Sequence, residues 1–345
     1  MKAAVFHELG KPLAIETVAT PQAGPGELVL KVHYCGICGS DLHATHPGTF
    51  VVPHGTILGH EFAGEIVESG ATGWKVGEMV TSVPLYACSD CRALGSTECK
   101  DNLGILCPKN TIVGLHPSAQ GAYAEYIKVS AREALRLPAA VKTREGATVE
   151  PLAVGLHAVN KGHVTLGDRV LILGGGPIGL AVTVFAKLAG ARDVIVSEYA
   201  PGRREVAGTM GATAVIDPAR EPVAEAFARL AKGPPDVVFD CVGVPGTLAQ
   251  CIELSRPFGR IVIVGVCMVE DRFVPLSAIF KELNIQFVLG YARPDWGIVL
   301  DVLESGRVDP RPMITDEVTL DQLPASFEAL RKPSGQIKVM VRPNG

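Results

Sequence analysis

A glycine-rich segment near the middle of the chain constrains the fold more than any other feature. It reads Gly-Gly-Gly-Pro-Ile-Gly over 174–179, follows the apolar run 169–173 and precedes a helical pattern over 180–189. A G-x-G-x-x-G motif between a strand and a helix is typical of dinucleotide-binding units. Its glycines provide a tight turn, close approach to the pyrophosphate and close helix packing. The predicted cofactor-binding residues here are Gly174, Gly176, Pro177, Ile178 and Gly179.

An acidic residue after the next strand predicts which dinucleotide is bound. Glu198 directly follows the predicted strand 193–197. It lies about twenty positions past the fingerprint, where a carboxylate bonds the adenosine ribose. A carboxylate at this place repels a 2′-phosphate, so NAD is expected over NADP. Arg203, a further candidate cofactor contact, and Arg204 lie close by and weaken this preference, although both also suit a solvated first helical turn.

The alternation of strands and helices continues past this point. Further strands are expected near 214–216, 236–240, 260–264 and 285–289, with helical stretches between most of them. With 169–173 and 193–197 they complete a doubly wound parallel sheet. Val242 and Gly265 follow the ends of two of these strands, and we expect both to contact the cofactor.

The N-terminal part has a different pattern. Residues 1–130 contain short strands separated by many glycines and prolines, which indicates a curled sheet or partial barrel. Cys38 lies there in a turn flanked by glycines, and His60 lies in Gly-His-Glu at 59–61. A thiolate and an imidazole suit zinc. Each is also compatible with an ordinary structural residue.

A third ligand is expected at the start of a helix. Glu150 precedes Pro151, a residue that suits a first helical turn. Cysteine, histidine and glutamate would leave one tetrahedral position open, as in a catalytic zinc site. The alternative for Glu150 is a favourable charge at the helix dipole.

Four of the nine cysteines are clustered and suggest a second metal site. Cys88 and Cys91 have C-x2-C spacing, and Cys99 and Cys107 follow. Four thiolates would close a structural zinc site with no open position. The alternative is a loop with reduced thiols.

Length and charge limit the remaining possibilities. The 345 residues predict two domains, because one core rarely grows past about 300 residues. The formal net charge of -4, without a charged tail, argues against nucleic acid or an anionic membrane as partner. The absence of a signal peptide and of a long apolar run leads us to expect a cytoplasmic protein.

These motifs, in this order, resemble the zinc-dependent medium-chain alcohol dehydrogenases. The matching segments are 38–43, 59–61, 150–153, the glycine fingerprint and 335–338, so the resemblance covers essentially the whole chain. The Glu-Pro-Leu-Ala form at 150–153 resembles the polyol, butanediol and threonine dehydrogenase branches. One departure is Leu94, which stands where the family has the third cysteine of its structural-zinc lobe, and it puts that zinc in doubt.

The resemblance implies an α/β architecture and a set of roles. A GroES-like catalytic domain is expected at 1–155 and 295–345, and a Rossmann domain at 156–294. Cys38, His60 and Glu150 would hold the catalytic zinc, and Glu61 would be a helper or exchanging ligand. Ser40 and His43 would form a proton relay, although they also suit a helix cap and a solvent-facing ring, and Lys338 would reach the cofactor pyrophosphate.

The implied reaction is reversible oxidation of a small secondary alcohol, diol or polyol by NAD. The resemblance also implies a homodimer or homotetramer that pairs through the strand near 285–289. Two alternatives remain open at this stage. One is an NADPH-dependent aldehyde or ketone reductase on the same scaffold, and the other is a zinc-free, non-catalytic member of the superfamily.

Overall fold

The structure, a computed structural model, describes residues 1–48, 50–86, 106–107, 110–332 and 335–345. The chain divides into two compact units. Unit 1 comprises Met1–Glu150 with Ala292–Gly345, and unit 2 comprises Pro151–Tyr291. The boundaries predicted from the sequence, after residues 155 and 294, differ from these by a few residues. None of the helices in the described residues combines the length and the apolar character that a membrane span requires.

Unit 2 is built on a six-stranded parallel sheet with the order β13-β12-β11-β14-β15-β16. The order reverses direction beside β11, and the crevice at such a switch point is where open parallel sheets bind ligands. The strands are β11 (Arg169–Leu173), β12 (Asp193–Ser197), β13 (Ala214–Ile216), β14 (Val237–Asp240), β15 (Arg260–Ile263) and β16 (Asn284–Phe287).

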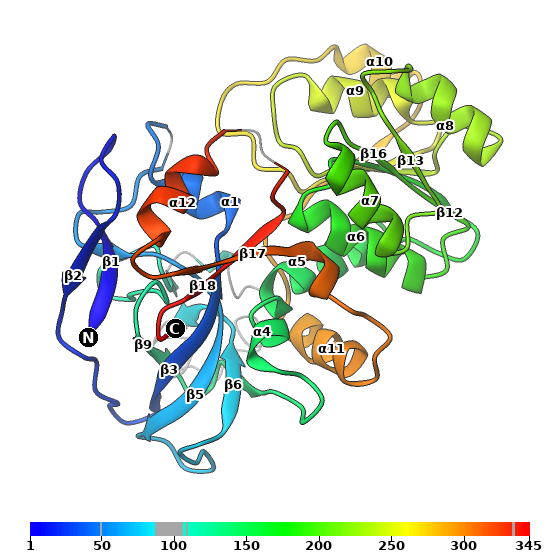
Figure 1. The fold of residues 1–345 in the computed structure, drawn as a ribbon. Helices are drawn as coiled ribbons and strands as arrows, with labels where there is room; N and C mark the ends of the chain where they lie inside the picture. Colours follow the sequence, from blue (N-terminus) through cyan, green and yellow to red (C-terminus); the bar gives the residue numbers. More distant parts are fainter. Residues whose placement is uncertain (49, 87–105, 108–109, 333–334) are drawn as a thin grey trace. The chain divides into compact units, whose positions relative to one another are not determined.

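Helices cover both faces of this sheet. In Figure 1, α6 and α7 lie on one side of the strands, and α8, α9 and α10 lie on the other. On the second side, Phe227 of α8 and Ile252 of α9 share a buried core with Leu171 of β11. The helices are α6 (Pro177–Leu188), α7 (Pro201–Thr209), α8 (Val223–Ala231), α9 (Thr247–Leu254) and α10 (Pro275–Ile279). The sequence predicted this doubly wound arrangement correctly.

Unit 1 is rich in β-structure, as expected for a GroES-like domain. A seven-stranded sheet has the order β10-β6-β5-β3-β18-β17, and β9 also pairs with β3. A three-stranded sheet, β2-β1-β4, and a hairpin, β7-β8, complete it. The strands are β1 (Lys2–Phe6), β2 (Ala14–Thr17), β3 (Glu27–Gly36), β4 (Thr56–Ile57), β5 (Glu61–Ser69), β6 (Met79–Ser82), β7 (Leu85–Tyr86), β8 (Thr111–Ile112), β9 (Tyr126–Ser130), β10 (Ala134–Arg136), β17 (Ile314–Thr319) and β18 (Lys338–Arg342).

Short helices flank these sheets. They are α1 (Gly39–Ala44), α4 (Thr143–Gly146), α11 (Arg293–Glu304) and α12 (Leu323–Ala329), and α5 (Val149–Lys161) crosses the boundary between the units. Strand β3 lies between β5 and β18, with Gly36 opposite both Glu61 and Met340. The end of β3 and the beginnings of β5 and β18 therefore meet at one place, although they are far apart in the sequence.

Candidate metal centre and cofactor site

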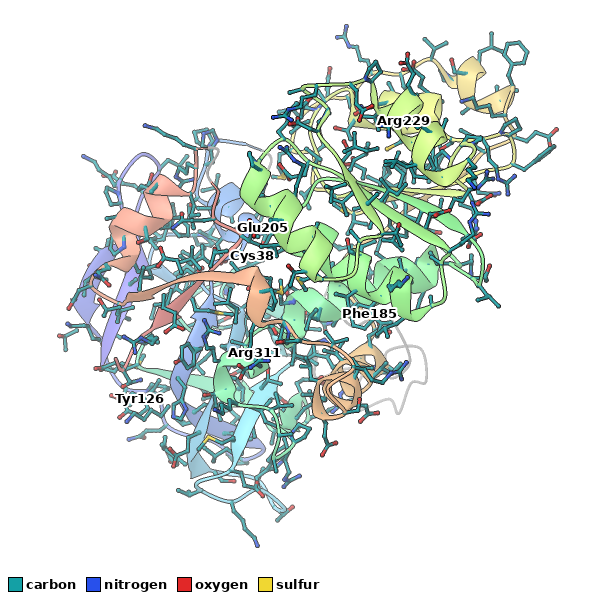
Figure 2. The ribbon with its side chains drawn as sticks, turned by 45° about the vertical axis from the view of Figure 1, so that its right-hand side comes forward. Cys38, Tyr126, Phe185, Glu205, Arg229 and Arg311 are labelled. Carbon is teal, nitrogen blue, oxygen red and sulfur yellow. The ribbon has the colours of Figure 1, made fainter. Side chains whose placement is uncertain are left out.

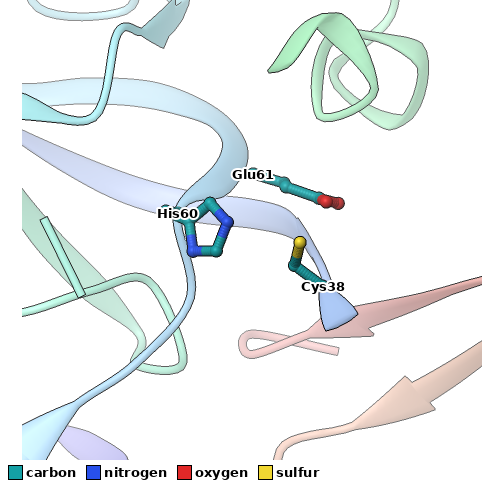
Figure 3. A group of neighbouring side chains, drawn as sticks. All are labelled: Cys38, His60 and Glu61. Carbon is teal, nitrogen blue, oxygen red and sulfur yellow. The ribbon is translucent and has the colours of Figure 1, made fainter. Parts of the chain in front are cut away.

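Three potential metal ligands meet where β3 ends and β5 begins. Cys38, labelled in Figure 2, is the N-cap residue of α1, His60 immediately precedes β5 and Glu61 is the first residue of β5. The ligand atoms of these three side chains all lie within 4.8 Å of one another, and Figure 3 shows them gathered together. Such a cluster of one thiol, one imidazole and one carboxylate provides donor types that zinc prefers.

Two glycines make room for this cluster. Gly59 has a φ of +93°, and a Cβ there would lie 2.6 Å from the Tyr123 ring. A Cβ on Gly36 would overlap the Glu61 carboxylate. Side chains at either position would therefore displace the residues that carry the ligands, and Gly59 also needs a backbone conformation that other residues rarely adopt.

The orientation of His60 fits a metal ligand. Its Nδ1 lies 3.2 Å from Asp41 Oδ1, and its Nε2 lies 3.3 Å from Ser40 Oγ, on the side of Cys38. A metal-binding histidine usually directs its second nitrogen to a carboxylate in this way, leaving the first for the metal. Burial alone lowers the pKa of His60, but Asp41 and Cys38 together outweigh burial and raise it well above its usual value. A zinc ion bound to His60 would therefore displace a proton.

Asp41 is a site residue that the sequence analysis did not single out. It is fully buried, and its Oδ2 accepts hydrogen bonds from Tyr123 Oη at 2.6 Å and from the Cys38 amide at 3.3 Å. Burial raises the pKa of Asp41, but His60 and these two donors together hold it below its usual value. An acidic residue three positions after an N-cap is a readable capping signal. Tyr123 lies 82 positions away and gives no such signal.

Glu61 forms a buried ion pair with Lys338. The Lys338 amino group donates to both carboxylate oxygens, at 2.7 and 2.6 Å, and to the Ile37 carbonyl at 3.0 Å. Burial alone lowers the pKa of Lys338, but Glu61 and the nearby Cys38 outweigh burial and raise it. Lys338 is only 1% exposed. Its predicted contact with a cofactor pyrophosphate would require these bonds to be exchanged, and that contact stays a prediction.

Glu150 lies near the cluster but is not part of the group of three. It is the second residue of α5, it is buried, and its charge contributes to raising the pKa of Lys338. The structure brings Glu61, rather than Glu150, within 4.8 Å of the Cys38 and His60 ligand atoms. The role of Glu150 as third ligand therefore stays a prediction.

The two predicted relay residues lie on α1. Ser40 Oγ donates to Cys38 Sγ at 3.2 Å, so this hydroxyl lies within the cluster. His43 is exposed and follows one helical turn later. Desolvation by the surrounding side chains lowers the pKa of His43, and the neighbouring His46 and Arg331 lower it further. A lowered pKa favours the neutral imidazole, and the relay role of Ser40 and His43 stays a prediction.

The predicted structural zinc lies largely outside the described residues. This applies to Cys88, Cys91 and Cys99, whereas Cys107 is described and half-buried. That site stays a prediction.

The glycine loop of unit 2 has the geometry that the fingerprint implies. Gly174 has a φ of +95°, and a Cβ on Gly179 would overlap the Gly174 carbonyl oxygen, so the helix packs closely on the strand end. Gly176 is the N-cap residue of α6, and Pro177 and Ile178 form its first turn. The first amide groups of a helix have no partner within it, and they form a site for phosphate.

Glu198 is fixed beside this loop. Its Oε2 accepts from the Gly175 amide and its Oε1 from the Ala200 amide, both at 2.8 Å. Arg204 makes structural contacts: it donates to the Glu198 carbonyl at 2.7 Å and forms an ion pair with Asp217 at 2.9 Å. The guanidinium of Arg203 lies closer to the loop, 3.9 Å from a Cβ built on Gly176.

Val242 and Gly265 follow β14 and β15 at the same edge of the sheet. Val242 is 47% exposed, and Asp240 Oδ1 accepts from the Val242 amide at 2.8 Å and from the Gly243 amide at 3.0 Å. A Cβ on Gly243 would overlap the backbone of Gly265, so these two loops touch. Asp240 therefore shapes the predicted cofactor edge, a role that its place in a strand pattern did not reveal.

Comparison with known proteins agrees with this architecture. Residues 24–139 match the alcohol dehydrogenase GroES-like domain, and residues 177–305 match the zinc-binding dehydrogenase domain. The chain is 34% identical to (R,R)-butanediol dehydrogenase of Bacillus subtilis over 100% of both chains. It is also 34% identical to a sorbitol dehydrogenase of that organism, over 100% of this chain and 98% of the relative.

Two solved structures also match this chain over nearly its whole length. A putative zinc-binding dehydrogenase from Sinorhizobium meliloti bound to NADP matches with a TM-score of 0.88 and 33% identity, over 99% of both chains. The 2R,3R-butanediol dehydrogenase of Bacillus subtilis matches with a TM-score of 0.88 and 32% identity, also over 99% of both chains.

A GroES-like unit with a thiol–imidazole–carboxylate cluster, joined to a Rossmann unit with a glycine loop, defines a zinc- and nicotinamide-dependent oxidoreductase. The chain belongs to the zinc-dependent medium-chain alcohol dehydrogenase family, in the branch that includes the butanediol and sorbitol dehydrogenases.

Proposed function

We propose that the chain interconverts a secondary alcohol of a small diol or polyol and the matching ketone, with NAD as the hydride carrier. The observation that carries this proposal is the convergence of Cys38, His60 and Glu61 within 4.8 Å in unit 1. The names of the relatives, butanediol and sorbitol dehydrogenase, support a substrate with neighbouring hydroxyl groups. A zinc ion in such a cluster acts as a Lewis acid and lowers the pKa of a bound hydroxyl.

Cys38 and His60 would hold the zinc ion together with one carboxylate. Glu150 is the better candidate for that carboxylate, because both oxygens of Glu61 are engaged with Lys338. Glu61 would then act beside the metal as a helper. This arrangement leaves one tetrahedral position for the substrate oxygen.

Ser40 would accept the substrate proton, since its hydroxyl lies among the ligand atoms. His43, exposed on the same helix and with a lowered pKa, would take up the proton that the Ser40 hydroxyl releases and pass it to solvent. The glycine loop, Glu198, Val242 and Gly265 would hold and orient the dinucleotide in unit 2. Orientation of the two reactants and exclusion of water are the protein's contribution to hydride transfer.

A substrate panel tests this function. Butane-2,3-diol, sorbitol, other polyols, simple secondary alcohols and 3-hydroxy amino acids are offered with NAD, and NADH formation is followed by absorbance. We expect turnover with a diol or polyol to exceed turnover with simple alcohols. Turnover limited to aldehydes or ketones with NADPH would favour the reductase alternative.

The preference for NAD rests on Glu198. Its carboxylate is oriented at the glycine loop by two backbone amides, and Arg204, one of the two nearby arginines, is paired with Asp217. The other arginine, Arg203, lies closer to the loop and is the residue that would favour NADP. The NADP bound to the Sinorhizobium meliloti protein is the reason for testing the alternative directly.

Glu198→Ala is expected to lower the ratio of kcat/KM for NAD to that for NADP by about tenfold or more, because a hydrogen bond to a charged group contributes about 1.5–3 kcal/mol. If the substitution also disorders the glycine loop, kcat/KM falls for both cofactors alike, and this effect cancels in their ratio. Glu205→Ala, an exposed carboxylate on α7, is the matched control and leaves the ratio unchanged. A wild-type chain that prefers NADP would refute the assignment.

We also propose that unit 2 pairs with a second copy through β16. This strand is an edge of the six-stranded sheet, and apolar side chains accompany it, with Phe287 65% and Leu289 56% exposed. An open apolar edge is a template for strand pairing, and a two-fold axis would join two sheets into one.

Phe287→Lys is therefore expected to shift the sedimentation of the protein from dimer or tetramer to a smaller species. Val215→Lys provides the control, because Val215 is also exposed and lies on β13, the opposite edge of the same sheet. A monomeric wild-type chain, or equal effects of the two substitutions, would show that β16 is not the interface.

A further inference from the structure

Tyr123 is a buried residue that contacts the neighbours of two candidate metal ligands. It is fully buried, its amide donates to the Leu58 carbonyl at 3.0 Å, and its own carbonyl accepts from the Ala4 amide at 2.8 Å. The ring lies directly against Gly59, where a Cβ would lie 2.6 Å from Cδ1 and 2.8 Å from Cε1. Tyr123 thus fixes the backbone segment that leads into His60.

The hydroxyl of Tyr123 reaches the carboxylate behind His60. It donates to Asp41 Oδ2 at 2.6 Å, and the amide of Cys38 donates to the same oxygen at 3.3 Å. With Oδ2 engaged, the other oxygen, Oδ1, faces His60 Nδ1 at 3.2 Å. One phenol therefore connects both metal-ligand segments through a single buried carboxylate.

We propose that Tyr123 is a positioning residue of the metal centre. By donating to Asp41 Oδ2, it fixes the carboxylate so that Oδ1 orients the His60 ring and Nε2 points toward Cys38. Its ring holds Gly59 and thereby the start of the His60 segment. The inference rests on the proposed function only in that Cys38 and His60 bind zinc. Removing a residue that hydrogen-bonds to a metal ligand commonly lowers metal affinity by about 10–100-fold.

Tyr123→Phe tests the hydroxyl while keeping the ring. We expect the zinc affinity of the metal-free protein, measured by competition with a chromophoric chelator, to fall about tenfold. Cobalt(II) bound in place of zinc is expected to show altered visible absorption, because its bands report ligand geometry. Tyr86→Phe is the matched control, since Tyr86 Oη donates to the Lys128 carbonyl at 2.8 Å, and it leaves affinity and spectrum unchanged.

A double-mutant cycle separates positioning from general destabilisation. Asp41→Asn is expected to weaken zinc binding more than Tyr123→Phe does, and Tyr123→Phe is expected to add little in the Asp41→Asn background. Equal effects of Tyr123→Phe in both backgrounds, or unchanged zinc affinity and cobalt spectrum in the single variant, would overturn the inference. A wild-type chain that binds no zinc would instead refute the proposed function.

Discussion

Replacing Cys38 with serine is expected to remove zinc from the candidate centre and to reduce turnover by at least about a thousandfold. A serine hydroxyl is a much poorer zinc ligand than a thiolate, and two protein ligands would remain where three are needed. A bound metal contributes several kcal/mol to transition-state stabilisation, and each 1.36 kcal/mol corresponds to a factor of ten in rate. Zinc content by elemental analysis and initial rates of NADH formation are measured on the same preparations.

Cys251→Ala is the matched control for this substitution. Cys251 is a fully buried cysteine in the core of unit 2, far in sequence from the ligands, and its loss removes a thiol without touching the cluster. We expect its zinc content and turnover to equal those of the wild type. Unchanged turnover in Cys38→Ser would mean that Cys38 is not a ligand of a catalytic metal.

Lys338→Met is expected to destabilise unit 1 of the metal-free protein by about 3–5 kcal/mol, because it leaves the Glu61 carboxylate buried without its partner. Glu61 is 1% exposed, and both of its oxygens accept from Lys338. The loss is expected to be smaller in the zinc-loaded protein, since a dication in the cluster also neutralises Glu61. Both tryptophans of the chain, Trp74 and Trp296, belong to unit 1, so their fluorescence follows urea unfolding of this unit.

Two further variants define the origin of this destabilisation. Glu61→Gln combined with Lys338→Met is expected to recover most of the lost stability, because no uncompensated charge is left buried. Lys2→Met removes an exposed ion pair with Asp321, 3.0 Å long, and is expected to change stability by less than about 1 kcal/mol. A loss in Lys338→Met no larger than that in Lys2→Met would show that the buried pair is not an important stabilising contact.

The sequence predicted best those features that depend on local pattern. The glycine loop, the parallel strands and Glu198 at the end of β12 were all readable, because turn chemistry and strand alternation act over a few residues. The structure accordingly has Gly174 at positive φ and Glu198 bonded to the Gly175 amide. The GroES-like character of unit 1 followed from the motifs and their order, and the comparisons confirmed it.

The contacts behind the candidate ligands were not readable, because they join distant parts of the chain. Tyr123 meets Asp41 across 82 positions, and Lys338 meets Glu61 across 277. Neither pairing follows from composition or periodicity, since each depends on which strands become neighbours in the sheet. Lys338, for which the sequence predicted a contact with the cofactor, is therefore found bonded to Glu61.

Turnover of the wild-type chain before and after metal removal tests the central claim most directly. The protein is stripped of metal with a chelator, assayed with NAD and the best substrate of the panel, and assayed again after one equivalent of zinc is returned. We expect activity to disappear with the metal and to return with zinc, whereas Cys38→Ser stays inactive throughout. Full turnover by the metal-free wild type would contradict the assignment of Cys38 and His60 as ligands of a catalytic zinc ion.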